Sequence, residues 1–207
     1  MKETSWRVSA DTPEAGRLIA AVLMGMLRMD RSARPLVLCI GSDRSTGDAL
    51  GPLVGSILAR RPERAYHVLG TLDCPVHAMN LLSVRQSIAA HQPVIAVDAS
   101  LGIPEQVGTV TVGIGPLRPG AGVRKQLPSV GDFHVTGTVN VGGFMEYLVL
   151  QNTRLYVVMK LATVIAQGIH LALQRTPSSD DQAVISARQP AVEPLEPPLP
   201  HFAPWQL

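Results

Sequence analysis

The chain has 207 residues, 46% of them hydrophobic, which is enough for one domain with a buried core. Its 18 basic and 16 acidic residues leave a net charge of +2, too balanced to indicate a nucleic-acid or membrane surface. Two cysteines cannot make a disulfide framework, and the apolar run at 18–27, about ten residues, is shorter than the roughly 20 that span a bilayer, so we expect a cytoplasmic protein.

The first half of the chain alternates predicted helices and strands. Apolar residues recur at helical spacing over about 12–29, and the apolar run Leu36–Ile40 predicts a buried strand that breaks into a glycine-containing turn. The elements expected next are a helix at 49–61, a strand at 66–69, a helix at 75–90 and a strand at 94–97. This alternation predicts an α/β fold in three layers.

The second half is expected to add two strands and a helix. Apolar and polar residues alternate at 107–112, which predicts a fourth strand near a sheet edge. A fifth strand is expected at 154–159, followed by a helix at 161–173. The glycine-rich segment between these strands, 115–143, is predicted to be a long loop, which in a compact domain is usually functional or disordered.

The composition divides the chain at about residue 175. Residues 1–175 are predicted to form a single α/β domain, a three-layer α/β/α sandwich with a five-stranded sheet. Residues 176–207 contain seven prolines and almost no periodic apolar pattern. This composition predicts a disordered tail that is dispensable for chemistry.

Two aspartates are the leading candidates for a functional site. Asp48 follows the turn after the first strand, and Asp98 comes where the apolar run of the third strand stops. Ligands of parallel sheets collect where strands end in carboxyl-terminal loops, so both side chains are expected in one cleft. Two carboxylates held together can have their protonation driven apart, one staying ionised as a base and the other protonated as an acid.

Each candidate has an alternative interpretation. Asp48 opens a predicted helix and could serve only as its N-cap. Cys74 and His77 suggest a nucleophile and base, but their spacing alone shows no productive contact, and a loop thiol with a helical histidine is the simpler interpretation. His134 is the one histidine of the glycine-rich segment; with both aspartates it would make a set suited to a divalent metal, although a surface or backbone-bonded histidine is the simpler interpretation.

Four motifs, taken together, resemble a known family. They are Gly41 with Asp43, Thr46–Pro52, Val97–Ala99 and Arg118–Val123. In this order they resemble the YyaC family of sporulation proteins (DUF1256-type), relatives of the germination protease of endospore-forming bacteria. The resemblance extends over roughly 36–173, and it implies an atypical aspartic-type endopeptidase whose two essential aspartates correspond to Asp48 and Asp98.

The resemblance also implies a phosphorylase/hydrolase-like fold shared with hydrogenase maturation proteases, with a mixed five-stranded sheet whose fourth strand is antiparallel. In those relatives an acid at each corresponding strand end binds nickel together with a histidine. The implied alternative is therefore a metal-assisted protease that holds a divalent metal such as nickel or zinc with Asp48, Asp98 and His134. The chain departs from the germination protease in being much shorter.

The function expected from these observations is hydrolysis of peptide bonds in a sporulation or germination protein, such as the small acid-soluble spore proteins. One aspartate would activate water and the other would protonate the leaving amine, with no cofactor. Arg124 or Lys125, or backbone N–H groups of the turn at Gly120 and Gly122, would bind substrate and stabilise the oxyanion.

The expected location is the cytoplasm of the forespore or mother cell of a spore-forming bacterium, without direct contact with nucleic acid or membrane. A non-catalytic sporulation factor that binds a partner peptide in the same cleft is the remaining alternative. The sequence does not specify the oligomeric state.

Overall fold

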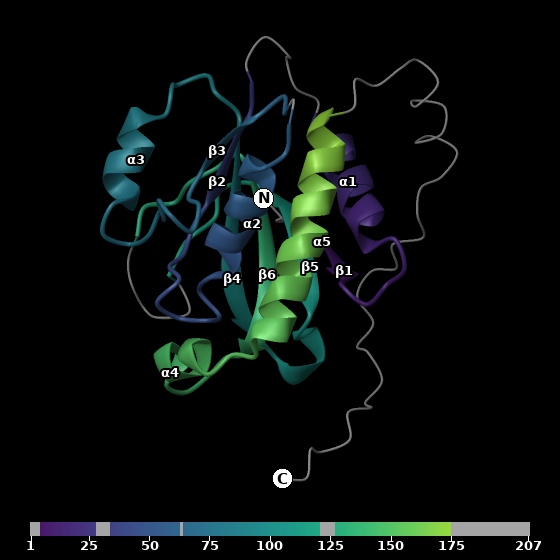
Figure 1. Ribbon diagram of the computed structural model, residues 1–207, viewed down its shortest axis with the longest axis vertical. Coiled ribbons are helices and arrows are strands. Elements are labelled where there is room, and N and C mark those ends of the chain that lie inside the picture. The colour runs from purple at the N-terminus through teal and green to yellow at the C-terminus, as the bar shows by residue number, and fades with distance from the viewer. Residues whose placement is uncertain (1–4, 28–33, 63, 121–126, 175–207) are drawn as a thin grey trace.

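A six-stranded mixed sheet forms the centre of the computed structural model, which describes residues 5–27, 34–62, 64–120 and 127–174 (Figure 1). The strands are β1 Ser5–Ser9, β2 Leu36–Cys39, β3 His67–Leu69, β4 Val94–Gly102, β5 Thr109–Ile114 and β6 Phe133–Val141. Their order in the sheet is β1-β5-β6-β4-β2-β3. The pairs β3·β2, β2·β4 and β4·β6 are parallel, whereas β5 is antiparallel to both of its neighbours.

Helices cover both faces of this sheet. They are α1 Ala15–Met26, α2 Leu50–Ala59, α3 Leu81–Ser87, α4 Glu146–Gln151 and α5 Leu155–Gln174, with a short 3₁₀ helix at Pro104–Gln106. Figure 1 shows α5 between α1 and α2 on one face of the sheet. The three helices bury one large core with that face, while α3 packs over the other face through a smaller cluster around Leu38, Ala96 and Leu81.

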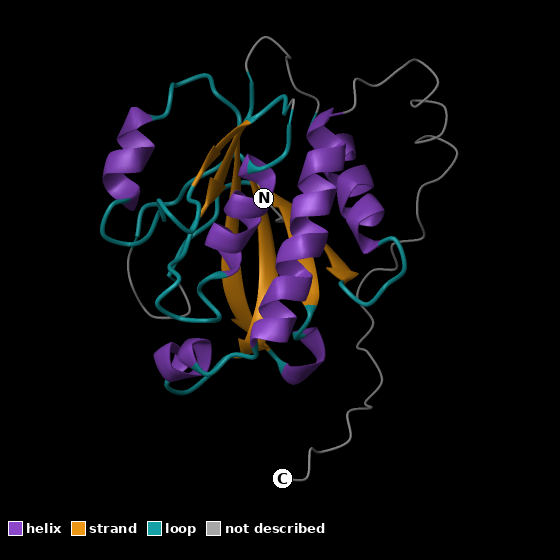
Figure 2. Cartoon of the chain, in the orientation of Figure 1, coloured by secondary structure: helices purple, strands orange, loops and turns teal. Residues whose placement is uncertain are grey.

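The α/β architecture agrees with the sequence prediction, but the strand count of five is wrong. The predicted strand at 154–159 is the start of α5, as Figure 2 shows, and two strands were missed. The edge strand β1 was not expected, and β6 lies in the segment predicted to be a loop. The predicted fourth strand is β5, and it is antiparallel as the resemblance implied.

Close packing of α2 on β2 fixes the part of the fold that carries the first aspartate. A Cβ atom on Gly51 would lie 2.0 Å from the carbonyl oxygen of Ile40, so only glycine allows the first turn of α2 to approach the end of β2 this closely. Gly41 has a φ of 140°, in the region that favours glycine, and begins the turn between them. The turn at 41–49 is thereby pressed against the carboxyl end of β2.

The helix predicted at 75–90 is shorter in the structure. Only Leu81–Ser87 is helical, because the preceding residues pair with the end of β2 instead. Val76 forms a parallel bridge with Ile40, and the N–H of Gly41 donates to the carbonyl oxygen of Val76 at 2.8 Å. This pairing brings residues 75–79 to the same end of the sheet as the turn at 41–49.

The predicted boundary at residue 175 lies at the edge of the described part of the chain. Residues 176–207, predicted to be a tail, lie outside the described residues. Within the described part of the chain, α5 has the length and mean hydropathy of a membrane-spanning helix. Eight of its residues are buried, which is the pattern of a helix that packs in the core of a domain.

Candidate functional site

Asp98 lies inside β4 rather than at its end. The sequence placed it at the point where the strand stops, but β4 continues to Gly102, paired with β6, and Asp98 is in register with Thr136. The last residue of β2 in register with β4 is Cys39, opposite Val97. Asp98 therefore sits one residue beyond the end of β2, on the side of β4 that β2 leaves uncovered.

The turn that carries Asp48 lies at the same end of β2. Helix α2 begins at Leu50 with Ala49 at its N-cap, and the side chain of this N-cap residue makes no capping hydrogen bond. The N–H of Gly47 donates to the carbonyl oxygen of Leu150 at 2.8 Å, which ties this turn to α4. Asp48 is half-buried in this turn, so its side chain is accessible at the end of the sheet.

A single pocket contains both aspartates, as the sequence predicted. Its volume is about 310 Å³. The lining comes from the end of β2 and the turn after it, Asp98 of β4, the segment 77–79 before α3, the residues Pro119, Gly120 and Leu127, and α4. The pocket therefore combines two aspartates with larger side chains, including Met79 and Tyr147.

The environment of Asp98 favours its protonated form. Burial raises the pKa of this carboxyl well above its ordinary value, and the nearby charge of Asp48 raises the pKa further. A hydrogen bond from the N–H of Ala99 to Oδ1, 2.8 Å long, opposes the shift without cancelling it. Asp98 is only 8% exposed, so the loss of solvation is the larger effect. One carboxyl of the pair is thus suited to hold a proton.

The metal set that the resemblance implied does not come together. His134 pairs with Ala96 in the β4·β6 register, two residues before Asp98, and it is not among the residues that line the pocket. Its Nδ1 donates to the carbonyl oxygen of Gly115 at 3.0 Å. Within the described residues, no three His, Cys, Asp or Glu side chains are placed to hold a metal ion. The residues present do not fit the implied metal.

Of the predicted substrate-binding residues, the structure places only Gly120. Gly120 lines the pocket together with Pro119, so the segment that ends at residue 120 lies at the same pocket as Asp48 and Asp98. Gly122, Arg124 and Lys125 lie outside the described residues.

His77 is a pocket residue whose role the sequence did not indicate. It was considered only with Cys74, which is exposed. The N–H of Met79 donates to Nδ1 of His77 at 3.2 Å, so the neutral ring carries its proton on Nε2. The backbone N–H of His77 also donates to Oδ1 of Asn80 at 2.8 Å. The signal that locates His77 is the bridge between Val76 and Ile40, which no local sequence pattern reveals.

Ser45 is a second pocket residue that was not predicted. Among the described residues, its Oγ is the one buried side-chain polar atom without a hydrogen-bond partner. A buried hydroxyl without a hydrogen-bond partner destabilises the folded state, and a ligand in the pocket could supply the missing hydrogen bond.

Comparison with known proteins identifies related sequences and folds. A family model described as "Protein of unknown function (DUF1256)" matches residues 7–168. A Bacillus subtilis (strain 168) protein described as "Uncharacterized protein YyaC" is 50% identical over 167 residues, covering 79% of this chain and 82% of the relative.

The solved structures with a similar fold are more distant. The [NiFe] hydrogenase maturation protease HycI from Thermococcus kodakarensis KOD1 matches 74% of this chain and 99% of its own, at 17% identity and a TM-score of 0.46. A hydrogenase 3 maturation protease matches 66% of this chain and 89% of its own, at 14% identity and a TM-score of 0.41.

Proposed function

The chain belongs to the DUF1256 family, and we propose that it is a peptidase that hydrolyses peptide bonds with the pair Asp48 and Asp98. One observation carries the proposal. Two carboxyl groups share a pocket, and burial together with the charge of Asp48 raises the pKa of Asp98. A carboxyl whose pKa is raised beside a second carboxyl is an arrangement suited to general acid and base catalysis.

The roles of the two aspartates follow from their environments. Asp48 is half-buried and acts as the base that removes a proton from water, whose oxygen attacks the carbonyl carbon of the peptide bond. Asp98, whose pKa is raised, transfers its proton to the amide nitrogen as the C–N bond breaks. The step consumes one water, and Asp98 is reprotonated as Asp48 releases the proton that it took.

His77 is placed to stabilise the oxyanion. Because its Nδ1 accepts a hydrogen bond from Met79, the Nε2–H of the neutral ring is available to the substrate in the pocket. A donor that is already oriented before the reaction stabilises developing negative charge without reorganisation. Backbone N–H groups near Gly120 are the second source of donors, together with the side chains of Arg124 and Lys125 that the sequence suggested.

From the resemblance of the sequence motifs, we extend the proposal to the biological substrate. It is a protein of sporulation or germination, such as the small acid-soluble spore proteins, cleaved in the cytoplasm of the forespore or mother cell. The non-catalytic factor that binds a partner peptide is the second candidate. The exposed apolar side chains of Met79 and Tyr147 at the pocket support it, because they offer a surface for binding that needs no cleavage.

The experiment incubates the purified full-length protein with small acid-soluble spore proteins, with and without a chelator, and identifies products by mass spectrometry. Matched reactions contain Asp48→Asn or Asp98→Asn. Cleavage that resists the chelator and disappears in both variants supports the acid pair. Cleavage that requires metal, or that persists in either variant, contradicts it. Absence of cleavage with retained binding leaves the peptide-binding factor.

A further inference from the structure

We infer that the rim of the acid pocket binds apolar side chains of a polypeptide, close to the bond that is cleaved. The inference rests on the proposed function and adds the class of substrate. The apolar rim consists of Met79, Phe144, Met145, Tyr147 and Leu148. The first of these residues lies on one side of the pocket and the others belong to the segment of α4.

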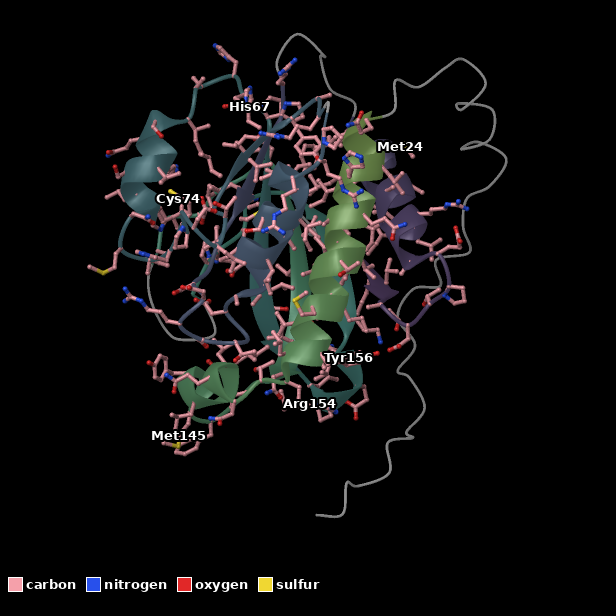
Figure 3. The ribbon with its side chains drawn as sticks, in the orientation of Figure 1. Met24, His67, Cys74, Met145, Arg154 and Tyr156 are labelled. Atoms are coloured by element: carbon pink, nitrogen blue, oxygen red, sulfur yellow. The ribbon has the colours of Figure 1, made fainter. Side chains whose placement is uncertain are left out.

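The exposure of these side chains is the first observation. Met79 is 89% exposed, Phe144 84% and Tyr147 62%, although side chains of this size usually gain most from burial. Single exposed apolar residues need no explanation, but four within five consecutive positions make a patch of the kind that marks an interaction site. Figure 3 shows Met145 at the outer edge of the molecule beside α4.

Continuity with the pocket identifies the occupant. Met79 and Tyr147 belong to the rim and also line the pocket that contains Asp48 and Asp98. At about 310 Å³ the pocket is at the lower end of the range for small-ligand sites, so a polypeptide must extend beyond it. A bound polypeptide that leaves the pocket past Met79 or Tyr147 would contact the rim.

The segment around α4 offers no basic side chain to an anionic occupant, although Arg44 lines the pocket beside it. Residues 142–151 carry one charged side chain, that of Glu146, whose Oε1 accepts a hydrogen bond from the N–H of Gly143 at 3.1 Å. No cation of this segment could pair with a phosphate or a carboxylate. The chemistry of the rim therefore fits aliphatic and aromatic side chains of an extended peptide.

The rim is held in a fixed position relative to the acid pair. Leu150 accepts the hydrogen bond from Gly47, the residue before Asp48. Asn140 of β6 donates through Nδ2 to the carbonyl oxygen of Val149 at 3.3 Å and to Oγ1 of Thr153 at 3.2 Å. These bonds fix α4 to the sheet and to the turn of Asp48, so a side chain bound on the rim would position the neighbouring peptide bond.

Met145 adds an observation from the backbone. It has a φ of 53°, a left-handed conformation that costs a residue with a side chain about 1 kcal/mol or more. The chain adopts it at the N-cap of α4, where it presents the side chain to solvent. Local strain of this kind is concentrated at binding and catalytic sites.

The test measures binding and cleavage separately. Two fluorescein-labelled peptides of equal length and charge differ only at four positions, which are Leu or Phe in one and Ser in the other. Fluorescence anisotropy measures their binding to the full-length Asp98→Asn protein. We expect the apolar peptide to bind at least about tenfold more tightly. The double variant Phe144→Ser/Tyr147→Ser, made in the same background, should abolish this difference.

Leu155→Ser/Tyr156→Ser is the matched control, because these α5 residues are also exposed apolar side chains and lie outside the pocket lining. It should leave the preference intact, and circular dichroism confirms that all variants fold. Equal binding of the two peptides overturns the inference. So does a change from dimer to monomer in sedimentation when Phe144 and Tyr147 are replaced, because the rim would then be a contact between copies.

Cleavage of both peptides by the unmodified protein distinguishes the two proposals. Cleavage without apolar preference supports the peptidase and overturns the rim. Preferential binding without cleavage of either peptide or of the spore proteins supports the rim as a binding surface and contradicts the peptidase.

Discussion

Opposing interactions act on the carboxyl of Asp98, and their balance decides what this residue can do. Burial and the charge of Asp48 favour the protonated form, whereas the N–H of Ala99 favours the ionised form. Burial is the largest of the three effects. A carboxyl in such a position keeps its proton to a higher pH than an exposed carboxyl does and carries a cost in stability whenever it is ionised.

Asp98→Asn should therefore change how stability depends on pH. The folded state holds its proton more tightly than the unfolded state, so Asp98 stabilises the fold below the ordinary carboxyl pKa of about 3.9 and loses that contribution as pH rises through its raised pKa. Between the two values the unmodified protein should lose up to about 1.4 kcal/mol per pH unit relative to the variant.

Urea unfolding from pH 4.5 to 8 measures this difference, with Asp43→Asn as the control because that aspartate is exposed. Parallel pH profiles for the unmodified protein and Asp98→Asn would show that Asp98 is not held protonated.

Asp48→Asn separates the catalytic interpretation of this residue from the N-cap interpretation. We expect hydrolysis to be lost and stability to change by less than about 0.5 kcal/mol, because Ala49 and not Asp48 is the N-cap of α2. The pKa of Asp98, followed by carboxyl-carbon NMR, should fall when the neighbouring charge is removed. Retained hydrolysis, or a stability loss of about 1 kcal/mol or more as caps give, would contradict the catalytic role.

His77→Ala should reduce kcat about 10²-fold or more while KM stays nearly constant, because a donor to the oxyanion acts on the transition state. His77→Gln keeps an N–H donor and should recover part of the rate. The bond from the N–H of Met79 to Nδ1 is the basis of this expectation. Steady-state kinetics on a cleaved spore protein measures both variants; an unchanged kcat in His77→Ala would remove the residue from the mechanism.

The site was predictable as far as its residues are marked by local sequence. Asp48 and Asp98 each come after an apolar run, so both could be assigned to one cleft, although Asp98 lies within β4 and not at its end as predicted. His77 could not be found in this way, because it reaches the pocket only through the pairing of Val76 with Ile40. The same holds for Tyr147, whose helix is positioned by the contact between Leu150 and Gly47.

At the scale of elements, short apolar runs explain the errors. Residues 154–159 contain two valines and read as a strand, but the buried positions Val158, Leu161, Ala162 and Ile165 continue with helical spacing into α5. In β6, Gly137 and Asn140, which strands disfavour, interrupt a run that is otherwise rich in β-branched residues. Gly137 gives room to α2 there, because a Cβ atom would lie 2.6 Å from Cδ2 of the buried Leu50, whose side chain would have to shift. Packing between layers, which no local pattern records, selects that glycine.

Gly51→Ala tests the contact between α2 and β2. The added methyl group would lie 2.0 Å from the carbonyl oxygen of Ile40 and 2.8 Å from its nitrogen, so backbone must move. We expect a loss of about 3 kcal/mol, at the upper end of overpacking effects, together with a weaker acid site because Ile40 lines the pocket.

The matched control is Gly25→Ala. Gly25 is exposed in α1 with nothing within 4 Å of its added Cβ, so the change should stabilise the protein by about 0.5–1 kcal/mol. Urea unfolding measures both variants. Equal stability of the two alanine variants would show that α2 and β2 are not in close contact.

In the whole molecule, the antiparallel part of the mixed sheet and the parallel part that carries the pocket lie on opposite sides of β6. The antiparallel strand β5 and the edge strand β1 extend the sheet under α1 and α5, on the other side of β6 from the parallel strands β4 and β2 that carry the pocket. Helix α3 covers the second face only near β2 and β4. The carboxyl end of β2 is left to short segments, which is where a sheet of this kind binds ligands.

The division of the chain at residue 175 leads to the last prediction. A protein ending at residue 175 should keep its fold and its hydrolytic or peptide-binding activity, because the seven prolines and sparse apolar residues of 176–207 offer no amphipathic element to the core. Thermal unfolding and cleavage of spore proteins compare it with the full chain. A fall in Tm of more than about 4 °C, equivalent to roughly 1 kcal/mol, would contradict the prediction. Phe202→Ser/Trp205→Ser in the full chain would then show whether docking of these two aromatic residues accounts for the loss.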